Sequence, residues 1–295
     1  MYSNREKLQL YEALKNNNFD IKSNEFYLPC ALFIILCIFI YNNSFNNNMT
    51  YTCNNILENT FLYVFASLVL FHILTMFFVK HKLIRYMEGL IRNIGPIGFI
   101  LLFILVLTGL IYLFHIYQTD VGVSHTLLIL LISVFSYLFS YIFILLRINN
   151  LYSTVLNSLI LGLMLIGIAF YFKSDVILEH LNDNHYLLLL YIVLFVILAH
   201  VIFYSIYGYN KKHRIIYSLI IMIIFIYILL MDTKKILTIT EPNCKKALNI
   251  CNKDITNRSC NILDYPSYPQ KSFEIFHDLI ILLQETANIF LAGNN

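Results

Sequence analysis

Long apolar runs separated by short polar segments make up most of the chain. A membrane-spanning helix needs about 20 mostly apolar residues. The runs that approach or reach this length are 26–41, 61–79, 97–117, 125–147, 151–172, 186–207, 214–231 and, less apolar than the others, 272–292. The pattern predicts an all-α fold, a polytopic membrane helical bundle of seven or eight transmembrane helices.

The composition agrees with a lipid environment. Hydrophobic residues make up 59% of the chain and charged residues only 13%, whereas soluble domains carry roughly 25% charged residues. The net charge of +3 is spread over the loops and gives no reason to expect a nucleic acid. The expected partner is the lipid bilayer. The expected organisation is a cytoplasmic N-terminal segment 1–25, a transmembrane bundle 26–231, a Cys-containing loop 232–271 and a C-terminal membrane helix 272–295.

Basic residues in the loops predict the orientation, because Lys and Arg are retained on the cytoplasmic side. Four of them lie in segment 1–25 and four in loop 80–96, whereas loops 42–60 and 118–124 have none. The N-terminus is therefore expected in the cytoplasm, and the two loops without basic residues are expected outside or in a lumen.

The second half of the chain gives conflicting signals. Basic residues come just before run 214–231, and Lys234 and Lys235 come just after it. Either the protein has eight spans and segment 232–271 is lumenal, or one of the runs 186–207 and 214–231 does not cross.

Cysteines favour the eight-span alternative. Cys53, Cys244, Cys251 and Cys260 all lie in predicted loops. If segment 232–271 is lumenal, they share one oxidising compartment as an even set, which makes them disulfide candidates. The expected location is an endomembrane of the ER or Golgi, or the cell surface.

The C-terminal run carries a stripe of acids. At 100° per residue, Asp278 lies about 40° from Glu274 and about 20° from Glu285, with His277 and Asn288 nearby. A charge at the bilayer centre costs at least about 2.5–3.5 kcal/mol, so these side chains are expected to face the interior of the bundle or a water-filled path. The alternative is an amphipathic helix lying on the membrane surface.

Asp232 ends the apolar run 214–231 and is a second acid of interest. One interpretation is an ordinary residue at a helix end in the headgroup region. The other pairs it with the C-terminal acids, because two close carboxylates share a proton or bind a cation. Oxygen ligands of this kind suit Ca²⁺.

Other polar positions predict less. Ser133, Ser136 and Ser140 form a small-residue stripe, which is typical of helix packing. The chain has no P-loop, HExxH, GxSxG or paired CxxC pattern, and we expect no enzyme and no bound cofactor.

Three short segments resemble a known family. Segment 224–237 (IFIYILLMDTKKIL) contains Asp232 and Thr233, segment 275–280 (IFHDLI) contains Asp278, and segment 93–99 reads NIGPIGF. Together they resemble the penultimate, last and third helices of the transmembrane BAX inhibitor motif family. The resemblance implies a seven-helix bundle that leaks Ca²⁺ from an internal store and suppresses cell death. It also implies that Asp232 and Asp278 gate the path.

The leading prediction is therefore a Bax inhibitor-like calcium leak channel that modulates ion homeostasis and cell death. Candidates for the ion path or gate are Asp232, Asp278, Glu274, Glu285 and His277, with Ca²⁺ as the transported ion. The alternatives are a membrane-embedded interaction or receptor-like protein without transport, and a small-molecule transporter.

Overall fold

The protein was analysed as a computed structural model. The structure describes residues 24–45, 52–53, 55–81, 83–117, 120–152, 210–240, 242–244 and 267–294, together with residues 8, 12, 21, 191–192, 195–196, 198–199, 202–203 and 206. Cys251, Cys260, nearly all of the predicted run 151–172 and more than half of the predicted run 186–207 lie outside the described residues.

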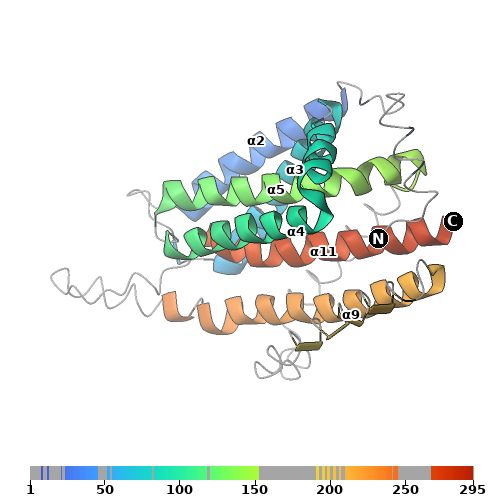
Figure 1. Ribbon diagram of the computed structural model, residues 1–295. Helices are drawn as coiled ribbons and strands as arrows, with labels where there is room; N and C mark the ends of the chain where they lie inside the picture. The colour runs from blue at the N-terminus through green and yellow to red at the C-terminus, as the bar shows by residue number, and fades with distance from the viewer. Residues whose placement is uncertain are drawn as a thin grey trace, which may run out of the picture. The chain divides into compact units, whose positions relative to one another are not determined.

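Every element within the described residues is a helix (Figure 1). The helices are α2 (Asn24–Ser44), α3 (Ile56–Lys80), α4 (Ile84–Ile116), α5 (Val121–Ile148), α9 (Lys211–Lys235), the π-helix η1 (Ile236–Thr240) and α11 (Tyr268–Asn294). Five of them, α2, α3, α5, α9 and α11, are long and apolar enough to cross a membrane. The all-α prediction is confirmed, and the chain has the character of an integral membrane protein.

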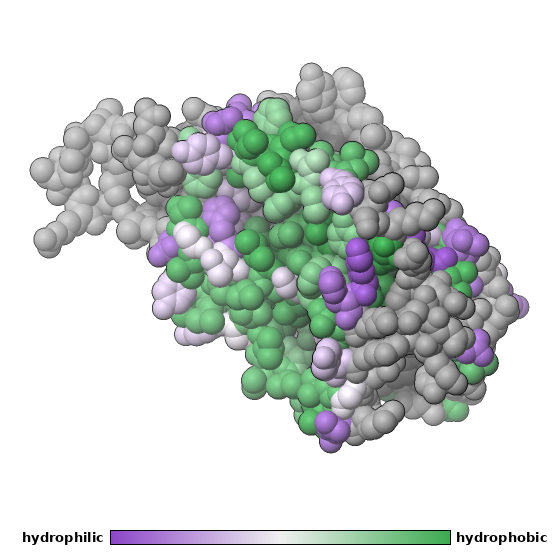
Figure 2. All heavy atoms as spheres, turned by 90° about the horizontal axis from the view of Figure 1, so that it is seen from above, coloured by the Kyte–Doolittle hydropathy of each residue, from purple (hydrophilic) through white to green (hydrophobic). Residues whose placement is uncertain are grey.

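The surface of the described residues also fits lipid. Many large apolar side chains are exposed, among them Ile104, Leu105, Tyr112 and Ile223. Figure 2 shows apolar side chains gathered on the face that it draws. In water, apolar patches this extensive are rare on a monomeric protein, so the hydrocarbon of a bilayer is the solvent that these side chains match.

Several helix boundaries differ from the prediction. Because α2 begins at Asn24, Pro29 lies in its second turn and removes one bond to the Glu25 carbonyl near the helix start. The apolar part of α4 is Leu101–Ile116, shorter than a full span. Gly95, with φ 73° and ψ 162°, breaks this helix, and Figure 1 shows its two parts running in different directions. A residue before proline avoids the α region, and here Pro96 follows.

The predicted loop 232–271 is partly helical, since α9 runs to Lys235, η1 continues to Thr240 and α11 begins at Tyr268. Apolar residues beyond the basic pair at 234–235 extend the helix into η1, which packs against α3. Both ends of the predicted loop are therefore helical, although they carry polar residues such as Lys235 and Gln270.

The chain divides into two compact units. We call Asp20–Ser140 with Lys235–Phe276 the α2–α5 unit, and Met1–Phe19, Tyr141–Lys234 and His277–Asn295 the α9 unit. Each unit is described separately.

The core of the α2–α5 unit joins α3, α5 and the start of α11. The rings of Phe71 and Phe139 lie 5.2 Å apart, and those of Phe71 and Phe276 lie 5.8 Å apart. Ser136 donates hydrogen bonds to the carbonyls of Ile132 and Phe71 at 2.7 and 3.2 Å. Ser136 is fully buried, so the packing role predicted for this small-residue stripe is confirmed at this position.

A disulfide closes one end of the same unit. Cys53, in the connection between α2 and α3, is bonded to Cys244, which follows η1. This bond joins two of the four predicted disulfide candidates. The start of α11 lies against the same connection, because the Tyr268 hydroxyl donates to the Thr52 carbonyl and accepts from the Asn59 side-chain amide.

Candidate functional site

The acidic stripe of α11 was the main candidate from the sequence, and two of its three acids are buried. Asp278 is 3% exposed and Glu285 is 5% exposed. The apolar residues around them on α11, including Leu279 and Leu282, are buried as well. A helix lying on the membrane surface would expose one polar face, so this burial argues against the surface-helix alternative.

Glu285 lies in a polar network that α9 completes. Ser218 Oγ donates to Glu285 Oε2 at 2.6 Å, and Asn288 Nδ2 donates to the same oxygen at 3.2 Å. Arg214 Nη2 donates to Asn288 Oδ1 at 2.8 Å. Arg214 is 5% exposed and Ser218 is fully buried. The Asn288 amide therefore accepts from a guanidinium and donates to a carboxylate, so it links two opposite buried charges.

The helix geometry explains why these four side chains meet. Arg214 and Ser218 are four residues apart on α9, and Glu285 and Asn288 are three apart on α11. Residues at these spacings share a helix face. Lys211 Nζ also donates to the Gly293 carbonyl at 3.2 Å, which places the start of α9 beside the end of α11. A cation at a helix C-terminus is favourable because of the helix dipole.

Asp278 has different surroundings. Its Oδ1 lies 3.6 Å from Nδ1 of His277, a residue whose side chain is 39% exposed. The His277 ring lies 6.3 Å from the ring of Phe225 on α9. Since α11 begins at Tyr268, Asp278 is almost three turns into the helix, about 15 Å along its axis.

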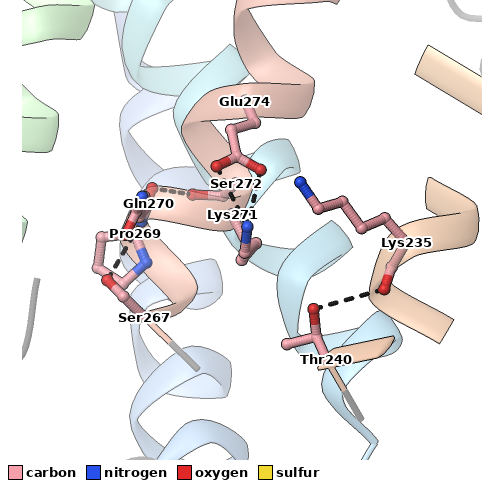
Figure 3. A network of polar contacts seen from close by, with 8 residues as sticks. All are labelled: Lys235, Thr240, Ser267, Pro269, Gln270, Lys271, Ser272 and Glu274. Carbon is pink, nitrogen blue, oxygen red and sulfur yellow. Dashed lines mark hydrogen bonds and ion pairs between the residues drawn. The ribbon is translucent and has the colours of Figure 1, made fainter. Parts of the chain in front are cut away.

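Glu274 belongs to the helix start rather than to the buried stripe. Lys271 Nζ lies 3.0 and 3.2 Å from its two carboxylate oxygens (Figure 3), and the two side chains are 19% and 34% exposed, Lys271 first. The pair is three residues apart on one helix. The pair lies near the start of the helix, which explains why both side chains remain partly exposed. The Lys271 ammonium neutralises the Glu274 carboxylate locally.

Asp232 lies within α9 rather than at its end, because the helix continues to Lys235. It is half-buried, and the neighbouring Thr233 is fully buried with its hydroxyl bonded to the Leu229 carbonyl at 2.8 Å. Asp232 and Asp278 both belong to the α9 unit. A proton or cation shared between them stays a prediction.

The sequence reading missed a neutral polar cluster in the α2–α5 unit. Tyr63 and His125 are joined by a 2.8 Å hydrogen bond between Oη and Nε2, and the rings of Tyr63 and Tyr268 stack at 5.7 Å. His125 Nδ1 lies 2.6 Å from the Val121 carbonyl. His125 is the first residue of the predicted run 125–147, and no pattern in the sequence pointed to Tyr63 as its partner.

No site of the usual metal-binding kind is visible in the part of the chain that the structure describes. It contains no group of three or more His, Cys, Asp or Glu side chains placed to hold one ion.

Comparison with protein-family models, with curated proteins and with solved structures finds no match for this chain. The resemblance to the transmembrane BAX inhibitor motif family therefore rests on the three short segments alone. The class that the fold defines is a multi-pass α-helical membrane protein.

Proposed function

We propose that this protein is a multi-pass ion leak channel, not an enzyme, in which Asp278 of α11 lines a path for cations such as Ca²⁺. The observation that carries the proposal is the burial of Asp278, at 3% exposure, almost three turns into an apolar helix. A carboxyl group at that depth is costly, and intramembrane acids of this kind commonly mark ion or proton paths.

The position of Glu285 supports dividing the acids between two roles. Its charge is linked to Arg214 through Asn288, so it is suited to holding α9 against α11. Asp278 lies about 10 Å from Glu285 along the helix axis, towards the helix start, and beside His277. We assign the ion path to Asp278, with His277 and Asp232 as the groups that modulate it and Glu274 as the acid at its mouth.

We further propose eight spans. A disulfide cannot reach across a bilayer, so Cys53 and Cys244 lie on one side and an even number of crossings separates them. With α2 before Cys53 and α11 after Cys244, the total is even. Eight spans satisfy this parity if α4 and the runs 151–172 and 186–207 cross, whereas seven do not.

The parity also supports an orientation and a location. Both chain ends then lie in the cytoplasm, in agreement with the basic residues of segment 1–25 and of Lys211 at the start of α9. The disulfide lies on the other side, in an oxidising compartment. An endomembrane of the secretory pathway or the cell surface provides such a compartment.

The second candidate function is a membrane-embedded interaction protein in which the buried acids only hold helices together. The observation that favours it is the Arg214–Asn288–Glu285–Ser218 network, in which the protein itself supplies a cationic partner and hydrogen-bond donors to the acid. The two functions make opposite statements about Asp278, because only a channel needs it for ion flow.

The test is Ca²⁺ flux into proteoliposomes that contain the wild type, Asp278→Asn, Asp232→Asn or the control Glu58→Gln, which removes an acid in the first turn of α3. We expect flux above that of empty liposomes for the wild type, a loss of about tenfold or more for Asp278→Asn, in line with a path controlled by one desolvated charge, a smaller loss for Asp232→Asn and little change for the control. Flux in the wild type should also fall on acidification, which neutralises carboxylates.

Three results would overturn the proposal. Flux no greater than that of empty liposomes would favour the interaction protein. Equal flux through the wild type and Asp278→Asn would remove Asp278 from any path. Uptake of a small organic solute without Ca²⁺ flux would instead favour a transporter.

A further inference from the structure

A pocket of about 270 Å³ opens between α2, α3 and α5 in the α2–α5 unit. Most of its lining is apolar, with Phe33, Leu70 and Ile132 among the contributing residues. Ile129 also lines it and is 49% exposed, so the pocket is open at the side of the helices. In a bilayer, that opening faces lipid.

Polar groups gather at one end of the pocket. Tyr63 and His125, joined by their 2.8 Å hydrogen bond, both line it, and so does Tyr41. Tyr63 and His125 lie near the beginnings of α3 and α5, whereas Leu70 and Ile132 lie seven residues further along the same two helices. Seven helical residues span about 10 Å. The pocket therefore grades from polar to apolar over that length.

The polar end is electrically neutral. Among the described residues that line the pocket there is no Lys, Arg, Asp or Glu. His125 Nδ1 faces the Val121 carbonyl, which can only accept, so this nitrogen carries a hydrogen. In the neutral ring Nε2 then accepts, and the Tyr63 hydroxyl donates to it. A phenol oxygen that donates its hydrogen can also accept a hydrogen bond.

We propose that this pocket binds a neutral lipid with a single hydroxyl group at its head. The hydroxyl would bond to the Tyr63–His125 pair, and the apolar body would extend past Leu70 and Ile132. Phosphate or carboxylate headgroups are disfavoured, because a charge buried without a partner is far more costly than a hydrogen-bonded hydroxyl. The volume is close to the lower end for ligand sites, about 300 Å³, so part of the lipid remains in the bilayer.

Sterols and diacylglycerols both carry this chemistry, and photolabelling separates them. The full-length protein in liposomes is irradiated with a photoactivatable cholesterol or a photoactivatable diacylglycerol, with and without excess unlabelled lipid. We expect one of the two to label residues of α2, α3 or α5, and the matching unlabelled lipid to suppress that labelling.

A photoactivatable phosphatidic acid should label these helices at least about fivefold less, since its charge finds no partner. Equal labelling by all three probes would overturn the proposal, as would no labelling of these helices.

Two neighbouring residues provide a matched pair of variants. Ile129 lines this pocket, whereas Leu130, 45% exposed on the same helix, lines a different one between α3, α4 and α5. Ile129→Trp should fill the pocket and reduce labelling at least about fivefold, while Leu130→Trp should leave it unchanged. Equal labelling of both variants would contradict the assignment of the pocket.

Tyr63→Phe tests the headgroup without changing the size of the pocket. The variant removes one neutral hydrogen bond. We therefore expect the unlabelled hydroxyl lipid to suppress photolabelling about fivefold less effectively than in the wild type. The methyl ether of the same lipid cannot donate, and its competition should be equal for the wild type and Tyr63→Phe. If Tyr63→Phe weakens both ligands equally, or neither, the hydroxyl does not bind at this pair.

Discussion

Glu285 and Asp278 are two buried acids on one face of the same helix, seven residues apart, and their surroundings differ. Glu285 accepts hydrogen bonds from Ser218 and Asn288, and Asn288 is bonded in turn to Arg214. Asp278 lies beside a half-exposed histidine. Two acids on one face of a helix can therefore contact different side chains.

The difference shows what a second helix contributes. Near the start of α9, Arg214 and Ser218 lie against the face of α11 that carries Glu285. The opposite charges of Arg214 and Glu285 offset the free-energy penalty of burying either charge alone. Further along, α9 presents the ring of Phe225 to His277 instead. The first arrangement suits helix association, whereas the second places an aromatic ring beside the histidine that neighbours Asp278.

The largest expected effect comes from removing the cation of the Glu285 network. Arg214→Leu leaves a buried carboxylate without its compensating charge and should lower the free energy of unfolding by about 3–5 kcal/mol. The matched control is Lys212→Leu, which removes an exposed charge two residues away and should change stability by less than about 0.5 kcal/mol. Equilibrium unfolding in detergent measures both. Equal losses would show that Arg214 acts only as a surface charge.

Removing the disulfide should have the next largest effect. Cys53→Ser or Cys244→Ser opens a bond between residues 191 positions apart and should cost about 2–4 kcal/mol. Cys37→Ser, which removes an exposed free thiol, is the control and should be close to neutral. A non-reducing gel should show altered mobility for both disulfide variants but not for the control; unaltered mobility would remove the parity argument for eight spans.

Ser218→Ala should cost less, about 1–3 kcal/mol, because it removes one buried hydrogen bond to a carboxylate. The comparison is Ser133→Ala, since the Ser133 hydroxyl donates to the Ile129 carbonyl of its own helix. Thermal unfolding of both variants should show a clear shift for the first and almost none for the second. Identical shifts would mean that Glu285 does not depend on Ser218.

Glu274→Gln should have the smallest effect. It removes a half-exposed ion pair with Lys271 at the start of α11, and pairs at this spacing contribute about 0.2–0.5 kcal/mol. The same unfolding measurement should place this variant close to the wild type at high salt, where the pair is screened. A loss above about 1 kcal/mol would show that Glu274 belongs with the buried acids.

The hydrophobic pattern predicted all of the long helices that the structure describes, because a length of apolar residues is a local property. It also placed Asp278 and Glu285 on one face, since helical periodicity is local too. Their partners could not be predicted. Arg214 and Ser218 lie about 70 residues away in the chain, and Arg214 was read only as a marker of the cytoplasmic side. Which faces of α9 and α11 meet is a tertiary property.

The predicted helix boundaries were wrong where a helix continues through polar residues. Lys234 and Lys235 suggested an end, yet η1 follows directly because Ile236 and Leu237 restore an apolar surface. The Tyr63–His125 pair was missed for a related reason, since a histidine in the first turn of a span resembles an ordinary interfacial residue until the neighbouring helix supplies its partner.

The contrast between the two acids is tested most directly by two double-mutant cycles of unfolding free energy, one pairing Arg214→Leu with Glu285→Gln and the other pairing it with Asp278→Asn. Arg214 is linked to Glu285 through Asn288, whereas Asp278 lies ten residues from Asn288, about 15 Å along the helix. We predict a coupling of about 1–3 kcal/mol in the first cycle and below about 0.5 kcal/mol in the second. Equal couplings, or none with Glu285, would contradict the separation of a structural acid from an ion-path acid.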